Sequence, residues 1–130
     1  MAEQIAQFRF LTHQITKSLI EISDAASIDQ MMDVEIQKAD GVDEEENKYK
    51  VEINIKIEDK NKSLNIEITA VGFFEFDSGI EESKKSIFFN VNAPAILFPY
   101  IRAYISALTS LSGIKTITIP TINLSGRAEK

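Results

Sequence analysis

Few side chains in this sequence of 130 residues have the types and spacing that covalent chemistry requires. Nucleophilic catalysis needs a base beside its serine or cysteine. The sequence has no cysteine, and its one histidine, His13, lies in a strand-like segment. Zinc sites need several histidine or cysteine ligands. The acidic run at residues 43–46 lacks the glycine and the alternating spacing of a calcium-binding loop.

The paired carboxylates Glu81-Glu82 have the groups for acid–base work, but nothing in the sequence gives the two different environments. Neither a G-x-G-x-x-G nor a Walker sequence occurs, so nucleotide chemistry is not indicated. The sequence therefore predicts neither an enzyme nor a bound metal or cofactor.

The composition is that of one globular domain over residues 1–130, with 44% hydrophobic and 26% charged residues. A formal net charge of -6 repels phosphate backbones, so we expect no nucleic-acid partner. No apolar stretch approaches the roughly 20 residues of a membrane-spanning helix. The N-terminus also lacks the basic and apolar segments of a secretory signal. We therefore expect a cytoplasmic protein that does not insert into membranes.

Strict alternation of apolar and polar residues predicts a β-hairpin. Apolar side chains occupy every second position in residues 49–57 and again in residues 64–70, with a polar turn at residues 59–62 between them. A period of two is typical of half-buried antiparallel strands. Near Gly72 the alternation slips, which predicts a bulge there.

Further strands are expected upstream of the hairpin. Residues 8–22 form one long strand with a phase change near Leu11, and residues 32–36 alternate as well. Residues 23–30 are polar or small and form a crossover, and residues 43–46 form a solvated acidic loop. Because the strands precede the helix without βαβ alternation, the sequence predicts an α+β fold with an antiparallel sheet.

One helix is predicted, from Asn92 as its cap to Leu111, just before Gly113. Pro94 suits its first turn. Pro99 lies inside the span and removes a backbone hydrogen bond, which predicts a kink or an irregular first turn.

Apolar side chains cover more of this helix than contact with one sheet requires. They leave only a narrow polar strip, which consists of Arg102, Ser106, Thr109 and Ser110. Two explanations are open. Either the extended segment that follows, residues 114–124, covers the second apolar face, or another subunit buries it.

Residues 94–113 resemble the helix signature of the SecB chaperones. The family pattern runs P-x-I-L-F-P-Y-x-R-x-x-I-S/T, followed by a glycine and then by P-x-x-N. The chain has PAILFPYIRAYIS from Pro94, then Gly113, and PTIN from Pro120. Upstream, residues 72–74 and 79–81 match two further blocks of the pattern, with one residue inserted between them.

The resemblance implies an α+β fold, in which a four-stranded antiparallel sheet carries a long kinked helix on one face. It also implies a dimer of dimers, a homotetramer, with the long helices packed between the two dimers. The residues expected at this oligomer interface are Tyr100, Ala103, Tyr104, Ala107, Leu108 and Leu111.

Members of the family bind non-native polypeptides in long apolar grooves without ATP and pass precursors to the export motor SecA. Flexible methionines and aromatic rings suit a surface that accepts unrelated sequences. The residues expected to contact such clients are Phe8, Phe10, Met31, Met32, Val34, Ile36 and Phe98. For each of them, ordinary core packing explains the side chain at least as well.

Two elements of the family, a lid helix and a motor-docking tail, are expected to be absent, because only residues 125–130 follow Leu124. Glu67 matches an acidic residue of the family's motor-contacting sheet face and is the candidate SecA contact, although a lone outward glutamate is usually just solvated. SecB-like proteins also protect antitoxins in toxin–antitoxin–chaperone modules, which is the first alternative function. A ligand-binding or structural domain on the same fold is the second.

Overall fold

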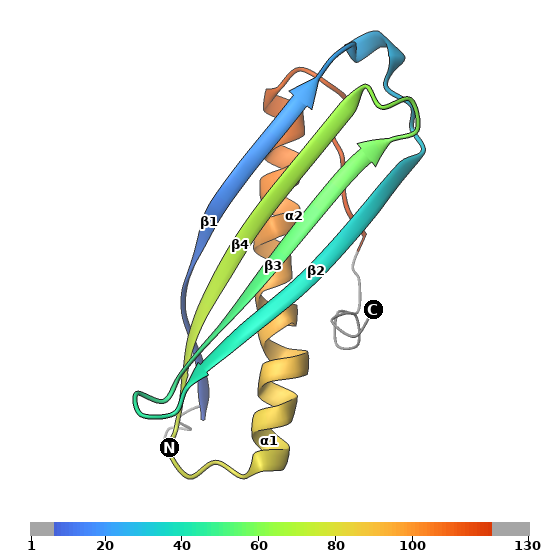
Figure 1. Cartoon of the computed structure of the whole chain (residues 1–130). Coiled ribbons are helices and arrows are strands. Elements are labelled where there is room, and N and C mark those ends of the chain that lie inside the picture. Colours follow the sequence, from blue (N-terminus) through green and yellow to red (C-terminus); the bar gives the residue numbers. More distant parts are fainter. Residues whose placement is uncertain (1–6, 121–130) are drawn as a thin grey trace.

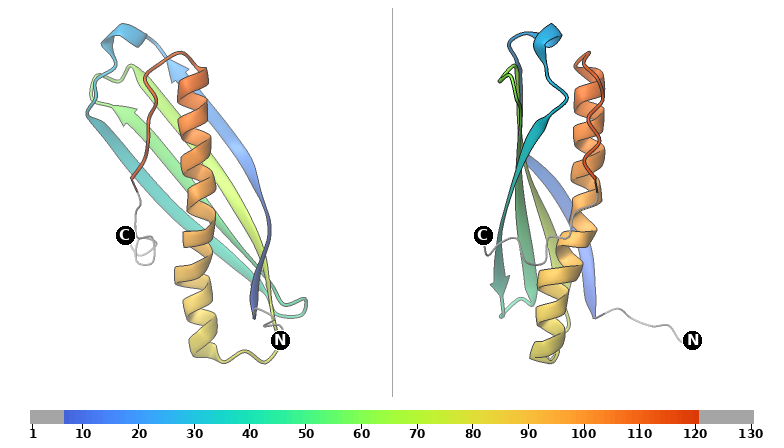
Figure 2. Two further views of the ribbon diagram at one scale, coloured as in Figure 1. Left: turned by 180° about the vertical axis from the view of Figure 1, so that it is seen from behind. Right: turned by 90° about the vertical axis from the view of Figure 1, so that its right-hand side faces the viewer.

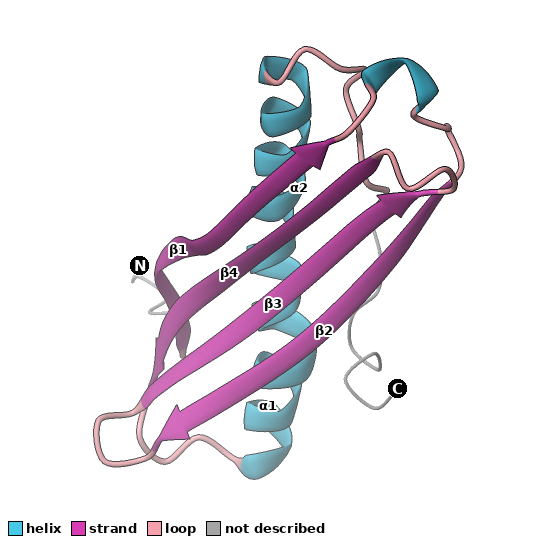
Figure 3. Ribbon diagram, turned by 45° about the horizontal axis from the view of Figure 1, so that its top comes forward, coloured by secondary structure: helices cyan, strands magenta, loops and turns pink. Residues whose placement is uncertain are grey.

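The computed structural model describes residues 7–120. The elements follow in the order β1 (Phe8–Ile22), a short 3₁₀ helix (Ala25–Ser27), β2 (Met32–Asp43), β3 (Lys48–Asp59), β4 (Leu64–Phe76), α1 (Glu82–Ile87), a π-helical turn (Phe88–Asn92) and α2 (Ala93–Leu111). The strands form one four-stranded antiparallel sheet in the order β1-β4-β3-β2. The long helix lies across one face of this sheet (Figure 1), and no helix among residues 7–120 covers the other face (Figure 3). The predicted α+β fold is confirmed.

The two central strands and α2 form the core. Every second side chain of β3 from Tyr49 to Ile57 is buried, as is every second one of β4 from Leu64 to Ala70. The predicted hairpin is therefore confirmed, and in its turn Lys62 has a positive φ of 62°. From α2, a row of buried side chains packs onto both strands: Leu97, Ile101 and Ile105.

Strand β1 is one long strand, as predicted, and its register with β4 shifts at Leu11. The bulge predicted at Gly72 is wrong, because β4 pairs with β3 there without any shift. Gly72 lies on the core face, where an added Cβ would stand 3.1 Å from the ring of Phe74 and 3.4 Å from Leu97. The glycine thus allows the helix to approach the sheet closely.

The helix begins at Glu82, so the predicted start after Asn92 is wrong. Asn92 has a helical backbone and makes no capping hydrogen bond. It lies in the π-helical turn, where the Ala93 amide bonds to the Phe88 carbonyl. In the right-hand view of Figure 2 the helix axis bends between its yellow and orange parts. The predicted end at Leu111 is confirmed.

Beyond the helix, the chain turns at Gly113, whose φ is 85°. Residues 114–120 then run back along α2 without joining the sheet (Figure 2, left). The rest of the extended segment predicted at residues 114–124 lies outside the described residues. No helix in the described part of the chain is long and apolar enough to cross a membrane.

Candidate functional site

The edge strand β2 presents an apolar row that the helix covers only in part. Pairing with β3 puts Met32, Val34 and Ile36 on the core side of the sheet. The long helix packs mainly on β4, β3 and β1, so β2 extends to one side of it (Figure 2). Val34 is 38% exposed, and Met32 and Ile36 are half-buried. A partly open apolar surface results.

Met32 lies at one end of this row, in an open cleft of about 570 Å³. The cleft is lined by the crossover, Leu64 and residues 113–118 of the C-terminal segment. The neighbouring Met31 is 67% exposed and borders a smaller hollow of about 290 Å³. Four of the predicted client-binding residues therefore lie at or near this edge of the sheet: Met32 lines the cleft, Met31 borders the smaller hollow, and Val34 and Ile36 continue the row along β2.

Asp59 holds the crossover that leads to these methionines. Its side chain is 1% exposed, and its carboxylate accepts backbone hydrogen bonds from Asp29 (2.9 Å), Ser63 (2.7 Å) and Leu64 (2.8 Å). Burial by itself raises the pKa of this carboxyl. The backbone hydrogen bonds outweigh that effect and hold the pKa of Asp59 below its ordinary value. The ionised side chain thus connects the hairpin turn to the crossover.

Sequence reasoning did not single out Asp59, because an aspartate at the end of a strand resembles any other turn residue. A second tie lies beside it, where the Lys60 amide donates to the Met31 carbonyl at 2.9 Å. In the sequence, the one feature that points to this role of Asp59 is its position at the first residue of a turn, where aspartate side chains often accept backbone hydrogen bonds.

The other predicted client-binding residues lie outside this cleft. Phe98 is 3% exposed and belongs to the core. Phe8 and Phe10 are half-buried near the opposite end of the sheet. The ring of Phe8 stacks on Phe74 and Phe88, with centroids 4.8 and 5.1 Å away. These rings pack against the protein's own core, and their contact with clients stays a prediction.

The outward face of α2 is a second open apolar surface. Ile96 is 36% exposed, Tyr100 43% and Leu111 87%. Ala103 and Ala107 are also exposed and lie between them at helical spacing. Four of the six residues predicted at the oligomer interface are on this face, which we call the outer stripe: Tyr100, Ala103, Ala107 and Leu111. Tyr100 lies at its border with β1, where its ring stacks on His13 with centroids 4.2 Å apart.

The other two predicted interface residues face the chain's own core. Tyr104 and Leu108 are half-buried and pack against the core cluster. The hydroxyl groups of Tyr104 and Ser18 are hydrogen-bonded at 2.7 Å, which ties α2 to β1.

The polar strip of α2 binds the C-terminal segment. Arg102 Nε donates to the Ile119 carbonyl at 2.6 Å, and Ser106 Oγ donates to the Ile117 carbonyl at 3.1 Å. Thr109 Oγ1 accepts from the Ile117 amide at 2.9 Å. The chain's own segment therefore covers the polar strip, whereas the outer stripe stays open in the single chain.

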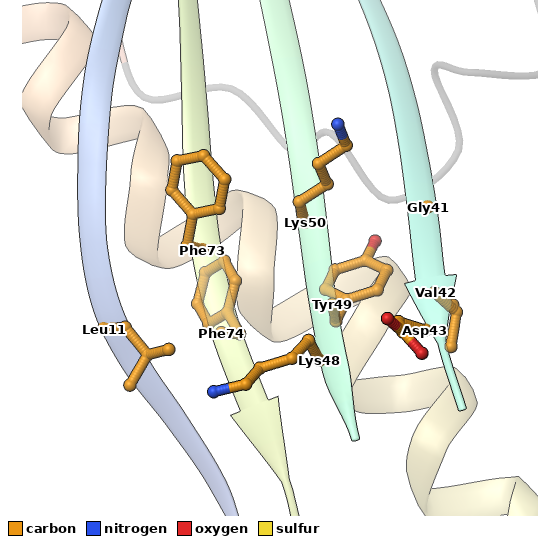
Figure 4. Close-up of a pocket in the computed structure, with 9 residues that line it drawn as sticks. All are labelled: Leu11, Gly41, Val42, Asp43, Lys48, Tyr49, Lys50, Phe73 and Phe74. Atoms are coloured by element: carbon orange, nitrogen blue, oxygen red, sulfur yellow. The ribbon is translucent and has the colours of Figure 1, made fainter. Parts of the chain in front are cut away.

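The helix-free face of the sheet holds a third hollow, of about 330 Å³, beside the β1 bulge (Figure 4). Leu11, which is 46% exposed, lines it together with Phe73 and Lys50. Lys48 also lines it and forms an ion pair with Glu75 at 3.4 Å. Within residues 7–120, no group of three or more His, Cys, Asp or Glu side chains is arranged to hold a metal ion.

Glu67, the candidate motor contact, lies on the same face and already has partners. Its carboxylate is 3.1 Å from Lys17 Nζ and accepts a hydrogen bond of 3.0 Å from Asn54 Nδ2. The hydrogen bonds from Asn54 and Lys17 lower the pKa of Glu67. A partner that used this carboxylate would have to compete with both.

The fold and these surfaces define a class: α+β proteins with one long helix on an antiparallel sheet and open apolar surfaces on the edge strand and the helix. A sequence model described as "Preprotein translocase subunit SecB" matches residues 10–126. The chain therefore belongs to the SecB family.

Two of the relatives that the chain resembles carry the family's name. The protein-export protein SecB of Orientia tsutsugamushi (strain Boryong) is 29% identical over 127 residues, which is 95% of this chain and 76% of the relative. The one from Rickettsia akari is 30% identical over 116 residues, covering 87% and 73%. An uncharacterized protein of Methanocaldococcus jannaschii is 42% identical over 65 residues, covering 48% and 39%.

A solved structure shares the fold. It is the SecB-like chaperone of Mycobacterium tuberculosis in complex with a peptide from the HigA1 antitoxin. Its TM-score is 0.75 at 15% sequence identity, and the match covers 90% of this chain and 88% of that one.

Proposed function

We propose that this protein is an ATP-independent holdase that keeps non-native polypeptides unfolded for export from the cytoplasm. One observation carries the proposal: the partly open apolar row of β2, which ends at Met32 beside the exposed Met31, on a chain of the SecB family. An extended polypeptide presents side chains alternately to its two sides, so it can lay every second one against such a row. Methionine side chains adapt to different partners.

The charge of the protein supports the same function. A net charge of -6 favours clients rich in lysine and arginine, and it opposes the aggregation of a protein with open apolar surfaces. Because each groove binds weakly, an assembly with several grooves gains affinity by engaging one client at several points.

The proposed assembly is a dimer of dimers that forms through the outer stripe of α2. The stripe combines large side chains such as Tyr100 and Leu111 with the small Ala103 and Ala107, which allow a second helix to approach closely. Light scattering on Ala103→Asp and on the exposed control Thr116→Asp tests this. The proposal expects smaller particles only for Ala103→Asp, and equal masses would contradict it.

The holdase activity is tested by suppressing the aggregation of a slowly refolding, basic protein without nucleotide. We expect protection that saturates with rising ratio of this protein to client. Met32→Asp should weaken client affinity by about 10- to 100-fold, the effect of losing the burial of one large apolar side chain. Leu11→Asp, which places the same charge at an exposed leucine on the other face, is the matched control.

An absence of protection by the folded wild-type protein would refute general holdase activity. Equal weakening by both substitutions would move the binding surface away from the Met32 cleft.

A second candidate function is the dedicated protection of one antitoxin, because a protein of the same fold was solved with an antitoxin peptide. The two functions differ in selectivity. An export chaperone binds many unfolded proteins with similar affinity, whereas a dedicated chaperone prefers one antitoxin segment by several orders of magnitude. For export, binding of SecA is also expected, and Glu67→Gln should weaken it if this carboxylate contributes.

A further inference from the structure

The C-terminal segment, residues 114–120, lies against the helix much as a bound extended peptide would. It belongs to no helix or strand. Its isoleucines turn inward, since Ile119 is 2% exposed and Ile114 and Ile117 pack against the core cluster. The intervening Lys115 and Thr118 are exposed.

The polar contacts of this segment use its backbone. Side chains of the polar strip bond to the carbonyls of Ile117 and Ile119 and to the amide of Ile117. Every polypeptide carries the same carbonyl and amide groups, so these bonds do not depend on the sequence that is bound. A protein that binds unrelated chains needs recognition of this kind.

The segment also stands in the path of a client. Residues 113–118 form one wall of the cleft that contains Met32, and Leu64 and the crossover line the same cleft. A polypeptide that follows the apolar row of β2 to its end therefore meets this segment.

We propose that residues 114–120 act as a tethered competitor: an internal peptide that narrows one end of the client groove, as a wall of the Met32 cleft, and leaves when a client binds. Three residues of the polar strip, Arg102, Ser106 and Thr109, form its backbone-binding site. This inference rests on the proposed holdase function.

The docked segment lowers the apparent affinity for clients, and the size of this decrease follows from the fraction of molecules in which the groove is free. If the segment is docked in about 90 to 99% of molecules, the apparent affinity for clients is about 10- to 100-fold lower than with the segment released. Clients that bind tightly can displace a competitor of this strength, whereas clients that bind weakly cannot.

The test uses the full chain and, as probe, a basic globular protein that has been reduced and carbamidomethylated, which leaves its cysteines uncharged and keeps it unfolded in native buffer. Ile119→Asp places a charge at the buried anchor of the segment. Leu11→Asp places the same charge at an exposed leucine on the other face of the sheet, outside the cleft and the segment, and is the matched control. We expect Ile119→Asp to bind the probe at least about tenfold more tightly than wild type, and Leu11→Asp to bind like wild type.

Amide exchange in the wild-type protein supplies a second measurement that needs no substitution. The Ile117 amide bonds to Thr109 Oγ1 and should exchange faster when the groove is saturated with the probe, because the segment has left. This readout decides the matter if Ile119→Asp does not fold, as judged by circular dichroism.

The outcomes separate the two proposals. Equal binding by wild type and folded Ile119→Asp, or an Ile117 amide that stays protected in the complex, would overturn the competitor and leave the holdase intact. Failure of wild type and both variants to bind the probe would overturn the holdase, and the competitor with it.

Discussion

Replacing Thr109 by valine should release the C-terminal segment without disturbing the core. Thr109 is 0% exposed, and valine has nearly its shape, so the substitution leaves little empty space. It removes the acceptor of the Ile117 amide, which lies 2.9 Å from Oγ1. The hydroxyl's own donation to the Ile105 carbonyl is lost as well, but that carbonyl is inside the helix.

Leaving a buried backbone amide without a partner costs about 1–3 kcal/mol. Local opening of the segment should become easier by the same amount, so the Ile117 amide should exchange about 5- to 150-fold faster in Thr109→Val than in wild type. Amide exchange followed by NMR measures this directly. Thr109→Ser is the control, because it keeps the hydroxyl and loses only a methyl group. Unchanged protection of Ile117 in Thr109→Val, or equal loss in both variants, would refute the assigned role of the hydroxyl.

Three further predictions concern the fold around the site. Tyr49→Phe should lower the free energy of unfolding by about 1–3 kcal/mol in denaturant titrations, because it removes a buried hydroxyl whose one hydrogen lies between Asp40 Oδ2 of β2 (2.7 Å) and the Phe89 carbonyl of the π-helical turn (3.0 Å); no loss would show that this hydrogen bond is not stabilising. Gly72→Val should cost about 1–3 kcal/mol by overpacking, whereas Gly41→Val, where only a lysine carbon lies within 4 Å, should be nearly neutral. Because the pKa of Asp59 is lower in the folded than in the unfolded state, its contribution to stability is complete above about pH 4 and is lost as the pH falls through the folded value. Asp59→Asn should flatten that acid-induced loss, and equal pH dependence in both proteins would contradict the assignment.

The sheet was predictable because burial alone dictates its pattern. On β3 and β4 one face meets the helix and the other meets solvent, so the sequence of residues 49–57 and 64–70 alternates with period two. The end of the helix was equally clear, since Gly113 adopts a φ of 85° that other residues rarely take.

The start of the helix was not predictable by the same rules. Residues 82–92 combine polar side chains with β-branched residues and two asparagines, which have modest helix propensity, and no apolar period marks them. Their helical form depends on tertiary contacts, such as the stacking of Phe89 on Tyr49 with ring centroids 3.9 Å apart. Gly72 misled the prediction for a related reason, because a glycine marks either a bulge or a close approach and only the packing partner decides.

The site was predictable in its apolar half and not in its polar half. The alternation of Met32, Val34 and Ile36 placed them on one face, and the structure leaves that face partly open. The place where the helix crosses the sheet decides which apolar side chains are buried. Phe98 joins the core, whereas Val34 stays exposed. Sequence pattern carries no information about that crossing.

The long helix therefore does more than cover the sheet. One row of its side chains is buried on β3 and β4, the polar strip holds the backbone of residues 114–120, and the outer stripe stays open. A helix that only packs on a sheet needs a single apolar face. The apolar surface of α2 is wider because it also includes the outer stripe. The polar strip is narrow because it meets a single extended chain. On this argument, substitutions in the outer stripe should change assembly and leave the segment docked, whereas substitutions in the polar strip should free the segment and leave assembly unchanged.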